Sequence, residues 1–230
     1  MARCSTVAHV TVLSSKTQPL CHQLNNVIQS DSFLSTDGTY KVLKINTGQE
    51  GVMQRYTNTA IALHWLVAIL IVGAFSLGLF MTDIPGFSPA KLRYYAWHKW
   101  AGVTVLLLAA VRLLWRLKNR PPDLSTDMPP WQRQAAHALH NVLYVFIFAV
   151  PLSGYFYTLA AGFPVVWFGV VQLPVLIAKN QALADTLKPV HYWLNMAMAA
   201  VVALHVLAAL KHHLVDRDDT LRRMLPGRSR

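Results

Sequence analysis

Four long apolar stretches dominate the chain from residue 53 onward. They cover roughly 61–82, 96–117, 136–161 and 188–212. A helix needs about 20 mostly apolar residues to cross a bilayer, whereas a strand of a membrane barrel needs only about 9–11. Backbone groups in lipid must be satisfied inside a helix or a closed barrel, and these stretches are too long for barrel strands. The sequence therefore predicts an all-α membrane protein, a four-transmembrane-helix bundle.

The charge of the chain fits a membrane protein better than a nucleic-acid-binding protein. Only 13% of the residues are charged and 54% are hydrophobic, with a formal net charge of +11. Soluble domains carry about 25% charged residues. The basic residues stand at the ends of the apolar stretches, and no basic stripe alternates with aromatic residues. We expect the lipid bilayer, and no nucleic acid, as a partner.

Lysine and arginine are distributed unequally between the two sides of the expected membrane helices. From residue 55 on, twelve lie on the side of the two termini and the connection between spans two and three, against five on the other side. Positively charged loops stay in the cytoplasm. The distribution predicts that both termini and the connection between spans two and three are cytoplasmic. Loops 83–95 and 162–187 then face the outer compartment, and the second loop is amphipathic enough to lie on the membrane surface.

Residues 1–52 differ from the rest of the chain. They are rich in polar residues and contain no apolar run long enough for a signal peptide. Their composition predicts disorder, and an alternative is that Met53 is the biological start, which makes 1–52 a spurious extension. Residues 53–230 form the second expected domain. Cys4 and Cys21 both lie in the extension, and Gln18 stands where a C-x-x-C-H haem attachment motif needs cysteine.

Two histidines lie on one face of the fourth expected span. His191 and His205 are fourteen residues apart, which is about 40° short of four helical turns and about 21 Å along the axis. A histidine inside a membrane is costly without a partner and is a candidate functional residue. Two such residues at different depths suit two stacked cofactors better than one.

Histidines of the first two spans match these two depths. His64 is at the cytoplasmic end of the first span, and His98 is at the outer end of the second. By depth, His191 is expected to meet His98, and His205 to meet His64. Zinc needs three or four protein ligands close together, but iron in a porphyrin needs only two axial ligands. The pattern predicts two non-covalent b-type haems with His64, His98, His191 and His205 as axial ligands.

Other residues near these depths are candidates for weaker roles. Gly102, one turn after His98, could let a flat cofactor approach the backbone, and Arg112 and Arg116 could pair with haem propionates or anchor the helix by snorkelling. His212, seven residues after His205, is the candidate for a hydrogen bond to a quinone. His137 and His140 could ligate, bind quinone or lie at the interface, and the interfacial position is favoured because it costs little.

Several segments together resemble the bacterial cytochrome b561 family. They are "ALHWLVAILIV", "WHKWAGVTVLLLAAVRLLWRL", "AHALHNVLYVFIFAVPLSGY", "HYWLNMAMAAVVALHVLAALKHHL" and "DDTLRRMLP". The likeness runs from about Tyr56 to Pro226 and is greatest to those inner-membrane members that oxidise superoxide. It implies a four-helix bundle with two b haems, and its ligand histidines fall on the four positions already derived.

The resemblance also implies an activity, the oxidation of superoxide at the periplasmic haem followed by electron transfer to ubiquinone. Superoxide is an anion, and basic side chains on the outer side of the membrane could attract it. These candidates are Lys91, Arg93, Lys99, Lys179 and Lys188. An alternative is an electron-transfer subunit that links a partner dehydrogenase or hydrogenase to the quinone pool. A histidine proton relay in a transporter is disfavoured because no acidic residue lies within the spans.

Overall fold

The computed structural model describes residues 33–34, 40–41, 55–122 and 128–227. The chain divides into two compact units, residues 1–52 and 53–230. In the first unit, the described residues form two short antiparallel strands, β1 (Phe33–Leu34) and β2 (Tyr40–Lys41). The remainder of this unit lies outside the described residues, and with it the expectation of disorder or of a later start.

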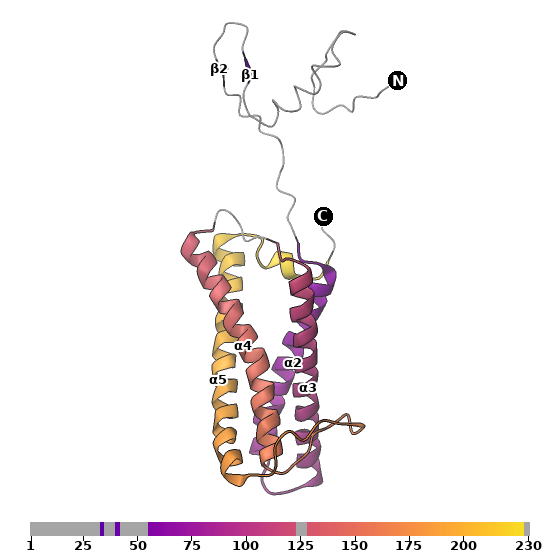
Figure 1. Ribbon diagram of the computed structural model, residues 1–230. Helices are drawn as coiled ribbons and strands as arrows, with labels where there is room; N and C mark the ends of the chain where they lie inside the picture. The colour runs from indigo at the N-terminus through magenta and orange to yellow at the C-terminus, as the bar shows by residue number, and fades with distance from the viewer. Residues whose placement is uncertain (1–32, 35–39, 42–54, 123–127, 228–230) are drawn as a thin grey trace, which may run out of the picture. The chain divides into compact units, whose positions relative to one another are not determined.

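Four long helices make up the second unit (Figure 1). They are α2 (Asn58–Asp83), α3 (Pro89–Lys118), α4 (Pro130–Ala160) and α5 (Gln181–Lys211). A π-helical turn, η1 (His212–Asp216), continues α5, and a 3-10 turn, η2 (Arg222–Met224), follows. All four helices are long and apolar enough to cross a membrane. The predicted four-helix membrane fold is confirmed.

The helices begin earlier than the apolar stretches alone indicated. Ser88 caps α3 by accepting a hydrogen bond from the amide of Lys91 at 3.2 Å, and Asn180 caps α5 in the same way for Leu183 at 3.0 Å. Such caps satisfy amides that have no partner within the helix, so polar residues upstream of the membrane stretch set the true start. The expectation that residues 181–187 belong to a loop is therefore wrong.

The loop between α4 and α5 contains a small hairpin. Strand β3 (Val166–Trp167) pairs with β4 (Val171–Gln172). The indole of Trp100 on α3 donates a hydrogen bond to the carbonyl of Val166 at 2.7 Å, and the indole of Trp167 donates to the hydroxyl of Thr104 at 3.2 Å. These bonds tie the hairpin to α3, while apolar side chains such as Phe168 and Val170 remain exposed.

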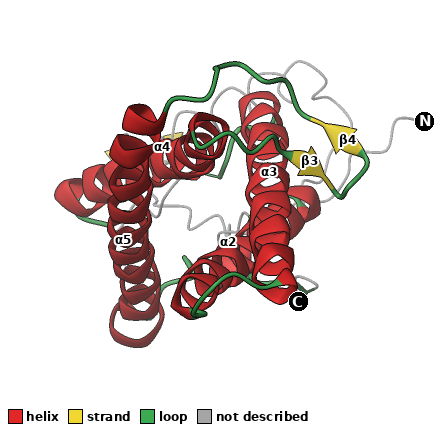
Figure 2. Ribbon diagram, turned by 90° about the horizontal axis from the view of Figure 1, so that it is seen from below, coloured by secondary structure: helices red, strands yellow, loops and turns green. Residues whose placement is uncertain are grey.

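The helices pack in sequence order around the bundle. Helix α2 packs against α3, α3 against α4, and α4 against α5, and Figure 2 shows this arrangement from one end. Few side chains are fully buried, among them Val105, Ala109 and Met198. Large apolar side chains face outward instead; Leu117 is 72% exposed and Leu207 63%. Exposed apolar area on this scale suits contact with lipid, as expected of a multi-pass membrane protein.

The two ends of the bundle are named here by their chain connections. The terminal end is where α2 begins and α5 ends, and the loop end holds the α2–α3 and α4–α5 connections (Figure 1). At the terminal end, the indole of Trp65 donates a hydrogen bond to the carbonyl of Met224 at 2.8 Å, and Arg55 donates to the carbonyls of Leu225 and Gly227. These contacts hold the C-terminal segment against the start of α2.

Candidate functional site

At the loop end, the structure brings His98 of α3 and His191 of α5 together. Their ring centroids lie 6.2 Å apart, with the ring planes at 82°. Both side chains line a cavity of about 600 Å³ between the helices. This volume falls within the range of about 300–1,000 Å³ that is usual for sites of small molecules and cofactors. The pair that depth alone predicted therefore faces a cofactor-sized space.

Backbone carbonyls orient both imidazoles of this pair. Nδ1 of His98 lies 2.9 Å from the carbonyl oxygen of Ala74 on α2, and Nδ1 of His191 lies 3.1 Å from that of Val150 on α4. A carbonyl oxygen only accepts, so Nδ1 carries the proton in each ring. Metal-ligating histidines usually donate this second N–H to a carbonyl or carboxylate. Nε2 of each ring is then left with the lone pair that binds a metal.

Polar side chains support the same tautomer of His191. The Ser153 hydroxyl lies 2.9 Å from Nδ1 and itself donates to the carbonyl of Val150 at 2.7 Å. The side-chain amide nitrogen of Asn195 lies 3.3 Å from Nε2 and donates to the carbonyl of His191 at 2.7 Å. A donor facing Nε2 requires that nitrogen to be unprotonated. Sequence reasoning missed both residues because neither stands out in an apolar helix.

Two glycines that the sequence analysis did not single out lie against these rings. A Cβ atom at Gly154 would come within 2.8 Å of Cε1 of His191, and one at Gly78 within 3.1 Å of Cε1 of His98. The predicted Gly102 does line the cavity, but a Cβ atom there would meet only Cβ of Pro151, at 4.0 Å. Beside the histidine pair, glycine is thus required at positions 78 and 154 more than at 102, which only the packing of neighbouring helices reveals.

At the terminal end, His64 of α2 faces His205 of α5. Their ring centroids are 6.3 Å apart. The ring of His140 on α4 joins them, 5.4 Å from that of His205, and its Nδ1 lies 2.7 Å from the carbonyl oxygen of Ala136. The sequence did not predict this contact of His140 with His205. Helix α4 begins at Pro130, so His140 lies about three turns into the helix, whereas His137 is exposed.

Helix α3 contributes two arginines to this end. Arg112 is close enough to His64 and His205 to interact electrostatically, and its Nη1 donates to the carbonyl of Ala60 at 3.3 Å. The guanidinium of Arg116 lies 5.6 Å from the ring centroid of Tyr144 on α4. The Tyr144 hydroxyl is buried without a hydrogen-bond partner among the described residues. Leaving such a group unpaired costs about 1–3 kcal/mol, so a polar group is expected beside it.

The predicted superoxide-attracting residues divide into two groups. Lys91 and Lys99 line the loop-end cavity, and Nζ of Lys91 donates to the carbonyl of Ile84 at 2.6 Å. The other three are exposed and do not line the cavity: Arg93, Lys179 and Lys188. The structure thus brings two of the five basic residues to the histidine pair.

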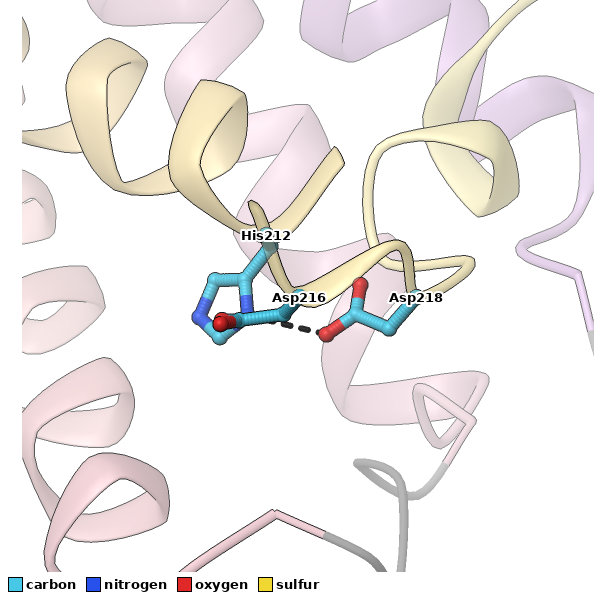
Figure 3. Close-up of side chains that lie close together, drawn as sticks. All are labelled: His212, Asp216 and Asp218. Carbon is cyan, nitrogen blue, oxygen red and sulfur yellow. Dashed lines mark hydrogen bonds and ion pairs between the residues drawn. The ribbon is translucent and has the colours of Figure 1, made fainter. Parts of the chain in front are cut away.

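His212 lies in a cluster with two carboxylates just beyond α5 (Figure 3). Its Nδ1 is 2.8 Å from Oδ2 of Asp218 and 3.0 Å from Oδ2 of Asp216. Burial raises the pKa of Asp218, but hydrogen bonds from Thr220 and the charge of His212 outweigh this effect and hold the pKa below its usual value. Nε2 of His212 makes no bond to a described residue and stays available to a ligand.

The three residues of this cluster could hold a cation by distance alone, since their ligand atoms lie within 4.8 Å of one another. However, Nζ of Lys211 lies 2.6 Å from Oδ2 of Asp216, and the amide of Thr220 donates to Oδ1 of Asp218 at 2.8 Å. The carboxylates are therefore already partnered, and the cluster explains the tight turn after α5 without a metal.

Comparison with known proteins agrees with this geometry. The model of the prokaryotic cytochrome b561 family matches residues 55–227. The chain belongs to this family. Its members are membrane electron-transfer proteins that bind b-type haem, and the match covers all four membrane helices.

Individual relatives extend this finding. Cytochrome b561 homolog 2 of Escherichia coli is 37% identical over 172 residues, which cover 75% of this chain and 92% of the relative. A protein of Yersinia pestis named probable superoxide oxidase CybB is 34% identical over 177 residues, covering 75% of this chain and 97% of the relative. Cytochrome b561 homolog 1 of Escherichia coli is 29% identical over 177 residues, covering 76% and 99%.

The residues of this cytochrome b561 suit a b-type haem. At the loop end, paired imidazoles with outward Nδ1–H donors, a glycine beside each ring and an apolar cavity meet the needs of a flat cofactor with two open axial positions. At the terminal end, Arg112 and Arg116 would be cations for the carboxylates of such a group, and the buried Tyr144 hydroxyl has no hydrogen-bond partner among the described residues.

Proposed function

We propose that this cytochrome b561 holds two b haems, one between His98 and His191 at the loop end and one between His64 and His205 at the terminal end. The two pairs of facing imidazoles support this assignment. Their separation along α5 follows from the fourteen residues between His191 and His205. When bound, the haems supply one-electron transfer between the two ends of the bundle.

We further propose that the electrons come from superoxide at the loop end, which faces the periplasm, and reach ubiquinone near the terminal end, in the cytoplasmic leaflet. Two superoxide ions then yield two oxygen molecules, and one quinone takes up two electrons and two protons. The observation that carries this proposal is the presence of Lys91 and Lys99 in the lining of the cavity that holds the loop-end histidines.

The protein's own residues have distinct roles in this scheme. Lys91 and Lys99 attract the anion to the cavity, and the exposed Arg93, Lys179 and Lys188 add to the positive potential around it. His212 donates a hydrogen bond from Nε2 to a quinone carbonyl, while Asp216 and Asp218 hold its other nitrogen.

The similarity to the protein named probable superoxide oxidase supports this choice of substrate. The unequal distribution of lysine and arginine along the sequence supports the orientation. From residue 55 on, twelve belong to the termini and the connection between the second and third spans, against five on the other side. An electron-transfer subunit that serves a partner dehydrogenase or hydrogenase would use the same histidines, so kinetics must separate the two functions.

The test is stopped-flow mixing of the purified protein with superoxide at several ionic strengths. We expect fast haem reduction, release of oxygen, turnover on addition of ubiquinone, and a rate that falls as salt screens the lysines. Slow reduction that does not depend on salt would reject the superoxide proposal and favour the subunit function.

A further inference from the structure

The hydroxyl of Tyr144 is the least explained polar group of the bundle. It is buried in α4 and has no hydrogen-bond partner among the described residues. Tyr144 lines a second cavity, of about 60 Å³, near the terminal end. A cavity needs about 10–15 Å³ of such volume to hold a water, so this one has room for several waters or a group the size of a carboxylate. Because buried hydroxyls are normally bonded, a polar group is expected beside this one, and the cavity lined by the same side chain is the candidate space for it.

The charge around this cavity is entirely positive among the described residues that line it. Four arginines contribute, and no carboxylate does. The four are Arg55, Arg112, Arg116 and Arg120. Guanidinium groups bind oxyanions with strong, often paired hydrogen bonds. The occupant is therefore expected to carry a carboxylate or a phosphate.

The cavity adjoins the terminal-end histidines through α3. Arg112 lines the cavity and also interacts electrostatically with His64 and His205. Arg116, one turn further along α3, stacks over the Tyr144 ring at 5.6 Å from its centroid. His140, one turn before Tyr144 on α4, contacts His205. The same two helices thus present one face to the histidines and to the cavity.

We infer that Tyr144 is a positioning residue whose hydroxyl donates a hydrogen bond to a carboxylate of the terminal-end haem, beside Arg112 and Arg116. This inference rests on the proposed haem between His64 and His205. The phosphate of an anionic lipid has similar chemistry, and basic pockets between membrane helices can bind such headgroups. The haem carboxylate is favoured because Arg112 belongs both to the cavity and to the surroundings of the histidines.

A hydrogen bond to a haem carboxylate affects the reduction potential of the iron as well as the binding of the haem. The donor partly neutralises the negative charge of the carboxylate, which otherwise stabilises the oxidised iron. Hydrogen bonding around a haem is one of the means by which a protein sets its reduction potential. Tyr144→Phe removes the donor but keeps the ring against which Arg116 packs, so we expect a lower potential with the haem retained.

The experiment compares the wild-type protein with Tyr144→Phe and with Tyr94→Phe, the same change at the loop end, where the ring of Tyr94 packs against the rings of Phe80 and Trp97. The haem-to-protein ratio of the wild type is measured first, because a ratio of one would reject the proposal of two haems. In that case the effect of Tyr144→Phe is measured on the potential of the single haem. Redox titration should show one midpoint potential lowered in Tyr144→Phe and none changed in Tyr94→Phe.

Infrared difference spectra of oxidised and reduced protein, with haem labelled by carbon-13 at its carboxyl groups, identify the partner. A shift of the isotope-sensitive carboxylate band in Tyr144→Phe alone would support the inference. Unchanged potentials together with an unshifted band would overturn it. An anionic phospholipid that native mass spectrometry finds on the wild type but not on Tyr144→Phe, with an unshifted haem band, would also overturn it and assign the cavity to a lipid phosphate.

Discussion

The two ends of the bundle hold their histidine pairs in different ways. At the loop end, the imidazoles of His98 and His191 are oriented by backbone carbonyls of neighbouring helices and lie against glycines. At the terminal end, the ring nitrogens of His64 and His205 make no hydrogen bond to any residue that the structure describes. A third imidazole, that of His140, and the guanidinium of Arg112 lie near them instead.

This difference shows two means of placing a ligand inside a membrane bundle. Backbone groups cannot move without moving a helix, so the imidazoles of the loop-end pair are preorganised. They are also sensitive to any larger side chain in place of the glycines beside them. Side chains and charges can rearrange and can respond to their partners, so the terminal-end pair depends more on electrostatic interactions. This contrast also fits their proposed roles, since the terminal end delivers electrons to a quinone that must take up protons.

The largest expected effect comes from removing the ligands themselves. His191→Ala should lose the loop-end haem and His205→Ala the terminal-end haem, because each iron loses one of two protein bonds. The haem-to-protein ratio and the visible spectrum of the purified variants measure this. His137→Ala, at an exposed position of α4, is the control and should keep both haems. Loss of the same haem from both variants would contradict the assignment.

A smaller effect is expected from one added methyl group at the loop end. Gly154→Ala places a Cβ atom 2.8 Å from Cε1 of His191, and overpacking of this kind costs about 1–3 kcal/mol. We expect weaker retention of the loop-end haem on dilution or heating, with the terminal-end haem unaffected. Gly73→Ala is the matched control, because nothing lies within 4 Å of its Cβ position. Equal effects of the two changes would disprove the steric account.

The lysines of the loop-end cavity should affect the rate without affecting the haem content. Lys99→Gln removes a charge that lines the cavity, whereas Lys188→Gln removes an exposed charge outside it. Electrostatic steering as a whole raises association rates by about 10–10³-fold. We expect a several-fold slower reaction with superoxide for Lys99→Gln, a smaller change for Lys188→Gln, and a weaker salt dependence in both. A larger effect on the rate from Lys188→Gln than from Lys99→Gln would show that the lysines lining the cavity are not the ones that guide superoxide.

The smallest effect concerns the turn after α5. The pKa of Asp218 is lowered in the folded protein, so its charge stabilises the turn above its unfolded pKa of about 3.9. This stabilisation is lost as the pH falls through the lower folded value. Asp218→Asn should remove it, at a cost of under about 1 kcal/mol near neutral pH. Hydrogen exchange of residues 212–220 between pH 3 and pH 7 measures the effect, and a wild type that behaves like Asp218→Asn throughout would disprove it.

Much of the fold followed from patterns within single helices. The four membrane helices were predicted and are confirmed, because about 20 consecutive apolar residues have few other stable arrangements. Their starts were not predicted, because caps such as Ser88 and Asn180 lie outside the apolar stretches. The contact of His140 with His205 was not predicted either, because it depends on how α4 packs against α5.

The amino-acid sequence by itself determined the number of membrane helices, the two pairs of facing histidines and the family to which the chain is similar, because periodicity and apolar length are local properties of a helix. Only the tertiary structure decided which groups surround each histidine. The carbonyls of Ala74 and Val150, the glycines at 78 and 154 and the hydroxyl of Tyr144 come from neighbouring helices. Their positions depend on how those helices rotate and slide against one another, which no single stretch of sequence specifies.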